Sequence, residues 1–130
     1  MAEKSIHVQF KDGFKGELIA PNDKVNIGVE KGTLAPYDML FGGLASCMYA
    51  TFLEIAEKKR IHFDSADIEV TGEKRTEIPT TLKWVNVKVT IKNAEKEKGL
   101  IKAMEIAANY CSIYQTISKV AEMSWDIEFE

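Results

Sequence analysis

Apolar and polar residues alternate in three short segments at the start of the chain, at 6–10, 14–20 and 25–29. A period of two places every second side chain on the same face of a strand. Asp12-Gly13, between the first two segments, is a strong signal for a tight turn. We therefore expect the first thirty residues to form three consecutive β-strands.

From Pro36 the pattern changes to a stretch of about 25 mostly apolar residues, the length of a long helix. Proline suits the first helical position because its missing N–H group would have no partner there. Asp38 near the start and the basic residues 58–60 at the end match the helix macrodipole. Small and apolar residues occupy most of the circumference, so we expect a long, buried central helix. One sheet and two short helices cannot easily cover it, which predicts a homodimer whose partner chain covers the rest.

The second half of the chain returns to alternation and then predicts two helices. The strand-like segments are 66–70, 85–91 and 125–129. Asn93 is placed to cap one helix, Asn109 to end it in a left-handed conformation, and Cys111 to open a second. The order is βββ-α-ββ-αα-β, a single α+β domain over residues 1–130 with a mainly antiparallel sheet.

Charge and composition exclude several classes of partner. The 130 residues carry a net charge of −3 with both signs spread along the chain, so no basic patch for nucleic acid is expected. Residues 1–6 lack the apolar core of a secretory leader. The uncharged stretch 39–53 falls short of the roughly 18–20 residues that span a bilayer. We expect a cytoplasmic protein without a membrane or nucleic-acid partner.

The candidate chemistry lies in the two cysteines, Cys47 and Cys111. They form no CxxC motif and have no histidine at ligand spacing, so neither a disulfide scaffold nor a metal site is predicted. A thiol at a helix N-terminus meets unpaired N–H groups that favour the thiolate, and this description fits Cys111. Cys47 lies about three turns inside its helix and would need a cation from elsewhere in the fold. Either thiol, judged alone, is more often inert core.

The segment 33–47, TLAPYDMLFGGLASC, resembles the signature of the OsmC/Ohr family, osmotically inducible protein C and organic hydroperoxide resistance protein. In that family a proline and one or two acidic residues precede an apolar, small-residue helix. The catalytic cysteine lies eleven positions after the proline, as Cys47 follows Pro36. A second cysteine opens the last helix, where this chain has Cys111. The expected order of elements also agrees along essentially the whole chain.

The resemblance implies an intertwined homodimer that acts as a thiol peroxidase on organic hydroperoxides. Cys47 would be the peroxidatic residue and Cys111 would resolve it as a disulfide, which an external dithiol resets. No metal or organic cofactor is implied, because sulfur is both nucleophile and electron donor. The family's active sites lie at the dimer interface between apolar walls. Four residues of the long helix could supply such walls, although each is more often plain core: Tyr37, Met39, Phe41 and Tyr49.

Three positions depart from the family pattern. The family's N-terminal arginine is missing, and Lys15, which stands roughly in its place, is a point charge and no planar bidentate donor. The acidic residue comes one position late, as Asp38, and on a regular helix it projects about 180° from Cys47. Asp38 reaches that thiol only if the helix starts after Pro36 or if the partner chain is used. Ser112 replaces the usual proline and can also cap a helix.

These departures leave two other functions open. One is a module of the same fold that binds an apolar or reactive small molecule without peroxidase turnover. The other is a structural dimeric domain in which both cysteines are inert core.

Overall fold

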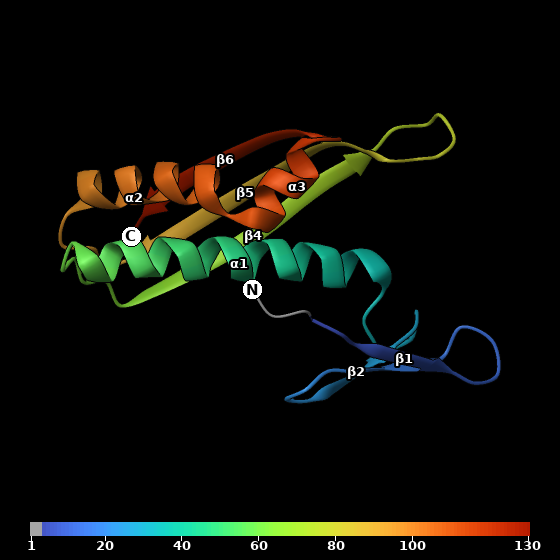
Figure 1. Ribbon diagram of the computed structural model, residues 1–130. Coiled ribbons are helices and arrows are strands. Elements are labelled where there is room, and N and C mark those ends of the chain that lie inside the picture. Colours follow the sequence, from blue (N-terminus) through green and yellow to red (C-terminus); the bar gives the residue numbers. More distant parts are fainter. Residues whose placement is uncertain (1–3) are drawn as a thin grey trace. The chain divides into compact units, whose positions relative to one another are not determined.

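The computed structural model describes residues 4–130 (Figure 1). Its elements are β1 (His7–Phe10), β2 (Gly16–Ile19), β3 (Lys24–Ile27), α1 (Pro36–Lys58), β4 (Ser65–Lys74), β5 (Leu82–Lys92), α2 (Glu97–Tyr110), α3 (Ser112–Ser118) and β6 (Glu122–Phe129). The predicted order βββ-α-ββ-αα-β is confirmed. The chain divides into two compact units, residues 1–41 and 42–130. A single domain over residues 1–130 stays a prediction. The absence of a leader in residues 1–6 also stays a prediction, and residues 1–3 of that segment lie outside the described part.

The N-terminal unit contains an antiparallel sheet in the order β1-β2-β3. Asp12 and Gly13 both have positive φ, as the tight-turn signal predicts. Gly16 is required on β2 because an added Cβ would lie 2.6 Å from the backbone oxygen of Gln9. The third strand is shorter than expected, since β3 ends at Ile27. Val29 lies beyond it and is 82% exposed, so it does not share the face of the strand.

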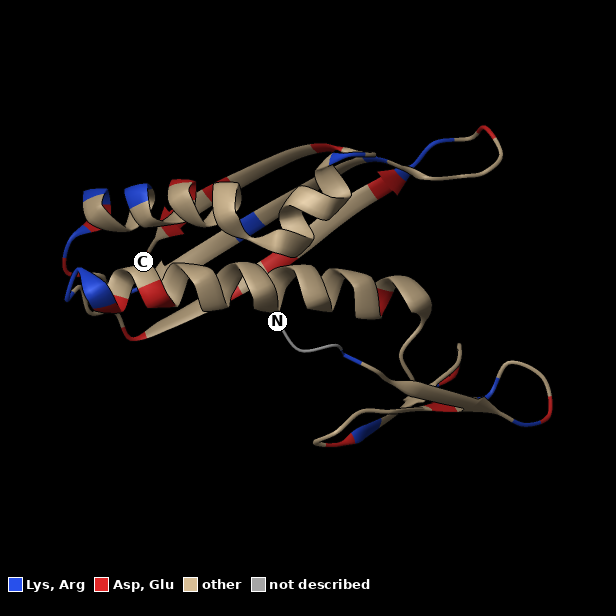
Figure 2. Cartoon of the chain, in the orientation of Figure 1, with Lys and Arg blue, Asp and Glu red and all other residues tan. Residues whose placement is uncertain are grey.

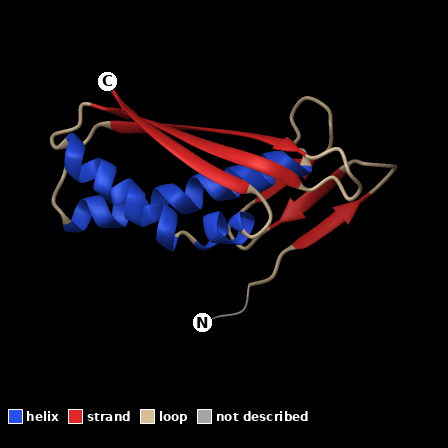
Figure 3. Cartoon of the chain, turned by 90° about the horizontal axis from the view of Figure 1, so that it is seen from above, coloured by secondary structure: helices blue, strands red, loops and turns tan. Residues whose placement is uncertain are grey.

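The second unit has its own three-stranded sheet, β4-β5-β6, with the three helices on one face of it (Figure 3). Strands β4 and β5 are antiparallel, whereas β5 and β6 are parallel. The chain returns to the starting end of the sheet through α2 and α3, and parallel strands need such a crossover. The described residues therefore hold two sheets where the sequence predicted one. The pairings remain mainly antiparallel, as expected.

Strand β5 forms the centre of the core of this unit. Its inward side chains have no exposed surface: Val85, Val87, Val89 and Ile91. The opposite face of the sheet is polar, and Asn86 on that face donates hydrogen bonds to Ser124 and Asp126 of β6. The clean period of two in the sequence therefore reflects a sheet covered by helices on one side only.

Helix α1 begins at Pro36 as predicted, but the expectation that it is buried is wrong for the single chain. Only one stripe with a spacing of four is buried: Leu44, Met48, Phe52 and Ala56. No charged side chain interrupts the helix between Asp38 and Glu54 (Figure 2). The helix is long and apolar enough to cross a membrane by length and composition, and 22% of its most apolar window is buried. One sheet and two short helices cover one side, and the remaining sides face outward.

The helix boundaries around the second cysteine differ from the prediction. Asn93 does not cap α2, which starts at Glu97; its side chain donates instead to Asp64 Oδ2, 2.6 Å away. Asn109 does not end the helix, which runs on to Tyr110. The break is made by Cys111, which is extended at φ −66° and ψ 116° and serves as the N-cap of α3. The extended backbone at Cys111 therefore separates α3 from α2.

Candidate functional site

Helices α1 and α3 meet where α1 carries a glycine. A Cβ added at Gly43 would lie 3.7 Å from Cδ1 of Ile113, so this residue sits against the first turn of α3. Cys47 is one turn further along α1 and on the same face as Gly43. The small residue therefore lets the start of α3 approach the helix face that carries the thiol.

The half-buried Cys47 thiol lies at the start of α3. Its Sγ is 4.0 Å from Oγ of Ser112. Burial alone would raise the pKa of Cys47, but hydrogen bonds from the backbone N–H of Ile113, the Cys111 thiol and both donors of Ser112 lower it overall. The groups that act most strongly on this pKa include no lysine or arginine of the described residues. Within the described residues of one chain, N–H, O–H and S–H donors at the start of another helix therefore lower the pKa of Cys47. Activation of Cys47 by a cation stays a prediction.

Cys111 has no exposed surface and caps α3 through its sulfur. Sγ accepts a hydrogen bond from the backbone N–H of Tyr114 at 3.4 Å. Burial raises the pKa of Cys111, and its hydrogen bond to Cys47 and the charge of the Cys47 thiolate raise it further, against the lowering effect of that N–H. The N–H groups at the start of α3 do favour the thiolate of Cys111, as expected, but loss of hydration outweighs them.

The two thiols are free and lie within hydrogen-bonding reach of each other, 64 positions apart in sequence. The acidic thiol of Cys47 accepts and the buried thiol of Cys111 donates. The pair therefore combines a half-buried sulfur of lowered pKa with a buried sulfur of raised pKa. Such an arrangement can perform two-electron thiol chemistry without a further group.

Lys15 belongs to the N-terminal unit, where its Nζ lies 3.1 Å from Oε1 of Glu30. Both side chains are well exposed and line a pocket of about 590 Å³ between the strands and the following turn. An exposed pair of this kind stabilises little and leaves the lysine charge shared with a carboxylate. A role for Lys15 at the thiol stays a prediction.

Asp38 serves the start of α1. Its Oδ2 accepts a hydrogen bond from the backbone N–H of Ala35 at 2.8 Å. This is the contact by which an acidic residue in the first turn satisfies a free donor at a helix start. The helix begins at Pro36, so a later start does not bring the carboxylate toward Cys47 within one chain. Its catalytic role stays a prediction that now depends on a partner chain.

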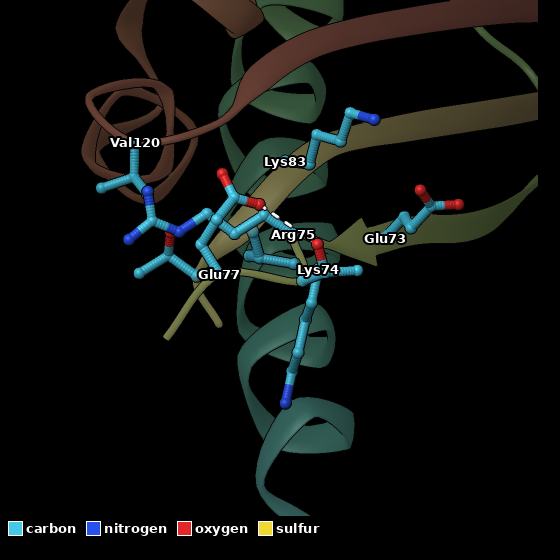
Figure 4. A pocket seen from close by; sticks show the side chains of 9 residues that line it. Glu73, Lys74, Arg75, Glu77, Lys83 and Val120 are labelled. Carbon is cyan, nitrogen blue, oxygen red and sulfur yellow. Dashed lines mark hydrogen bonds between the residues drawn. The ribbon is translucent and has the colours of Figure 1, made fainter. Parts of the chain in front are cut away.

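Neither Arg60 nor Arg75 is among the groups that most strongly shift the pKa of Cys47. Arg75 donates from Nε to the carbonyl oxygen of Pro79 at 2.9 Å and so holds the loop between β4 and β5 together. It lines a pocket of about 410 Å³ at the base of that loop, with side chains of both charge signs around it (Figure 4). Arg60 lies just past α1 in a left-handed conformation at φ 57°.

The four predicted wall residues are half-buried: Tyr37, Met39, Phe41 and Tyr49. Tyr37 and Phe41 contact each other edge to face, with ring centroids 5.9 Å apart. Tyr49 contacts the core residue Phe52, with ring centroids 6.3 Å apart. Half-burial leaves each residue part of its surface for a further contact, and their role as walls of a substrate pocket stays a prediction.

Sequence reasoning missed the two residues that approach Cys47 from α3, Ser112 and Ile113. Ser112 was noted only as a helix cap in place of a proline. A signal was present, since serine keeps a backbone N–H and adds a hydroxyl donor, whereas proline has neither. Nothing in the local pattern indicated that these donors face a thiol on another helix.

A protein-family model described as "OsmC-like protein" matches residues 29–126. This range covers about three quarters of the chain, includes both cysteines and excludes Lys15. The chain matches no curated protein.

Solved structures with the same fold match nearly the entire chain. A hypothetical protein from Aquifex aeolicus VF5 has 22% identity and a TM-score of 0.86, with coverage of 100% of this chain and 99% of that one. An OsmC-like protein from Mycoplasma pneumoniae has 19% identity and a TM-score of 0.87, with coverage of 98% and 97%. The organic hydroperoxide resistance protein OhrB of Bacillus subtilis has 14% identity and a TM-score of 0.67, with coverage of 95% and 98%. At these identities the likeness shows the fold.

Proposed function

This chain belongs to the OsmC-like protein family, and we propose that it is a cysteine-based thiol peroxidase that reduces organic hydroperoxides. One observation carries the proposal: the half-buried thiol of Cys47 has a lowered pKa, and a second, fully buried thiol, Cys111, is among the groups that lower it. A lowered pKa provides the thiolate, which is the nucleophilic form of cysteine. The second thiol within reach provides an intramolecular route for the oxidised product. The match to solved hydroperoxide resistance proteins supports the same reaction class.

In the first step the Cys47 thiolate attacks one peroxide oxygen. An S–O bond forms, the O–O bond breaks, and the alkoxide leaves and takes a proton to become an alcohol. Sulfur gives two electrons to the peroxide, so Cys47 becomes a sulfenic acid. Neither a metal nor an organic cofactor takes part in this step.

In the second step Cys111 attacks the Cys47 sulfenic acid. The S–S bond forms, the S–O bond breaks, and hydroxide leaves with a proton as water. Before oxidation, the Cys47 thiolate raises the pKa of Cys111 through its charge and through the hydrogen bond that it accepts. The neutral sulfenic acid removes the charge effect and weakens that hydrogen bond, so Cys111 becomes more acidic after the first step. The pair is thus ordered, with Cys47 reacting first.

An external dithiol then resets the disulfide by exchange. Cys111 has no exposed surface and Cys47 is half-buried, so one thiolate of the reductant attacks the Cys47 sulfur, and Cys111 leaves as a thiolate that takes up a proton. The second thiol of the reductant then attacks the reductant's own sulfur in the mixed disulfide, which releases Cys47 as thiolate and leaves the reductant oxidised. The departing thiolate is received by the backbone N–H of Tyr114, which already donates to Cys111 in the reduced protein. Reduction therefore returns both sulfurs to their starting partners.

The exposed sides of α1 support a homodimer, which is typical of the OsmC/Ohr family. The substrate would then lie between apolar walls that include Tyr37, Phe41 and Tyr49, and an organic rather than an inorganic peroxide would be favoured there. Asp38 and Lys15, if catalytic, would act through this interface. The proposal predicts a mass near twice 14.6 kDa by light scattering at micromolar concentration.

The absence of an arginine in the N-terminal strands favours a second candidate function. The chain has only Arg60 and Arg75, both after α1. A site without a planar cationic donor could bind an apolar or reactive small molecule while lacking peroxidase turnover. Recovery of a tightly bound small molecule from purified protein that consumes no hydroperoxide would favour this function.

The test of the peroxidase is consumption of cumene hydroperoxide by the reduced chain with dithiothreitol as reductant. We expect turnover in the wild type and none in Cys47→Ser. Hydrogen peroxide serves as the comparison substrate and should react more slowly. Absence of turnover together with an unchanged thiol titre after excess hydroperoxide would rule the proposal out.

A further inference from the structure

We propose that Ser112 is a positioning residue of the reacting centre, whose hydroxyl donates to the Cys47 sulfur in place of a cationic donor. The inference rests on the proposed function, because it explains how Cys47 is activated as the nucleophile. It assigns a specific role to a residue that sequence reasoning treated as a helix cap. It also accounts for a chain that has no arginine before residue 60.

The geometry that carries the inference is the contact between two side chains from different helices. Oγ of Ser112 lies 4.0 Å from Sγ of Cys47, within the range of hydrogen bonds to sulfur. Ser112 is exposed, and α3 is capped by the sulfur of Cys111. The Ser112 hydroxyl is therefore not needed for the cap and is available to the thiol. Because sulfur accepts weakly when neutral and strongly when charged, such a contact favours the thiolate.

The backbone N–H of the same residue adds a second donor. It acts on Cys47 together with the hydroxyl, and both favour the charged form. A proline at this position would remove the two donors at once, because it has neither a hydroxyl nor an N–H. The first position of a helix accepts proline readily, so the helix itself would tolerate the change. The Ser112→Pro variant therefore tests the pKa of the Cys47 thiol without disturbing the fold of the helix.

Few other polar groups face Cys47 from the elements packed against it. From α3 these are the Cys111 thiol and the backbone N–H of Ile113, and from α1 no charged side chain lies between residues 39 and 53. Thr51 on α1 donates to the carbonyl oxygen of Cys47 and not to its sulfur. Ser112 therefore contributes two of the four donors among the strongest influences on the thiol.

The experiment measures alkylation of Cys47 by iodoacetamide against pH, with mass spectrometry to assign the labelled sulfur and without any peroxide. The variants are Ser112→Thr, Ser112→Ala and Ser112→Pro. Ser118→Ala is the matched control, since this hydroxyl lies at the other end of α3 and donates to the carbonyl oxygen of Gln115. Thermal melting of each variant verifies that the protein is folded.

We expect the pH profile of Ser112→Thr and Ser118→Ala to match the wild type. Ser112→Ala should slow alkylation at neutral pH about threefold and Ser112→Pro about tenfold, as losses of one and two modest hydrogen bonds. Each slower profile should move to higher pH and reach the same plateau. Unchanged profiles for folded Ser112→Ala and Ser112→Pro would overturn the inference. An equal shift in Ser118→Ala would also overturn it.

The outcome is distinguishable from failure of the proposed function. Shifted profiles in a chain that consumes no hydroperoxide would uphold the role of Ser112 and refute the peroxidase. Hydroperoxide turnover with profiles that do not move would uphold the peroxidase and refute the role of Ser112.

Discussion

The two sulfur environments of this protein differ although both lie at the start of α3. Cys111 belongs to that helix end and caps it, but it has no exposed surface and its pKa is raised. Cys47 comes from the middle of another helix, is half-buried, and has a lowered pKa. Cys111, which caps α3, therefore has a raised pKa, whereas Cys47, which only faces the start of that helix, has a lowered one. Burial opposes the charged form of both thiols, but four hydrogen-bond donors together outweigh it at Cys47, whereas the donors at Cys111 do not.

The donors at the start of α3 therefore act on the sulfur that they face. The first-turn donors of Ser112 and Ile113 face Cys47, which keeps part of its surface in water. The thiolate is thus formed where a substrate can reach it, and the buried thiol is held in reserve. The two roles proposed for the pair follow from this asymmetry.

The largest expected effect comes from exchanging the two cysteines for serine. Cys47→Ser should abolish hydroperoxide turnover, because the chain then lacks an accessible thiolate. Cys111→Ser should keep one rapid oxidation of Cys47 per chain but form no intramolecular disulfide. Single-turnover kinetics with a sulfenic-acid trap distinguish the two variants. Equal residual turnover in both would remove the asymmetry on which the assignment depends.

Labelling of the native, reduced chain should give very different alkylation rates for the two thiols, although the effect is smaller than that of the cysteine exchanges. Cys47 is half-buried and keeps part of its surface exposed, whereas Cys111 reacts only after local opening of the structure. We expect iodoacetamide to label Cys47 on the order of a hundredfold faster than Cys111 at neutral pH. Labelling in denaturant, where both thiols react alike, is the control. Comparable rates in the native protein would contradict the burial of Cys111.

The pH dependence of Cys47 should respond to the thiol that donates to it. Cys111→Ala removes a donor that lowers the pKa of Cys47, so the alkylation profile should move to higher pH. Cys111→Ser keeps an O–H donor and should move it less. By linkage, the lowered pKa of Cys47 makes the reduced protein more stable as pH rises from that pKa toward the ordinary thiol value. The gain is lost as pH falls back through the lowered pKa.

The contact between α1 and α3 can be loosened at Gly43. Gly43→Leu places a large side chain against Ile113 and should displace the start of α3, slowing alkylation of Cys47 at neutral pH several-fold. Gly43→Ala is the matched control, because its Cβ would meet Ile113 at 3.7 Å, an ordinary contact. A folded Gly43→Leu chain with an unchanged profile would show that close helix approach does not matter for the thiol.

The smallest effect is expected at Lys15. Its charge is exposed and paired with Glu30, so Lys15→Ala should leave the alkylation profile of Cys47 unchanged and alter peroxide turnover less than threefold. Glu30→Ala, which frees the same charge, is the companion variant. A loss of turnover of tenfold or more in Lys15→Ala would establish the role that the family arginine suggests for this position.

Sequence periodicity predicted the elements well because sheet and helix faces repeat with fixed periods. It located α1 at Pro36 and the strands β4, β5 and β6 by their inward residues. It failed at Asn93 and Asn109, where side-chain propensity gave way to a contact with Asp64 and to a helix that runs on to Tyr110. Such outcomes depend on tertiary partners, which a local pattern does not contain.

The candidate site shows the same division. The roles of Cys47 and Cys111 followed from a family resemblance, whereas the local preference for a thiolate at the start of a helix is outweighed at Cys111 by burial. Burial of Cys111 and the approach of Ser112 to Cys47 arise from residues about 65 positions away in sequence. Only the packing of α3 on α1 brings these groups together, so no local rule could weigh them.

The two thiols can be titrated before and after one equivalent of cumene hydroperoxide, with mass spectrometry to locate the oxidised sulfur. We expect the loss of two thiols per chain, a single Cys47–Cys111 disulfide, and in Cys111→Ser a sulfenic acid at residue 47. Two thiols that survive the treatment in a folded chain, or a sulfenic acid that forms first on Cys111, would contradict it.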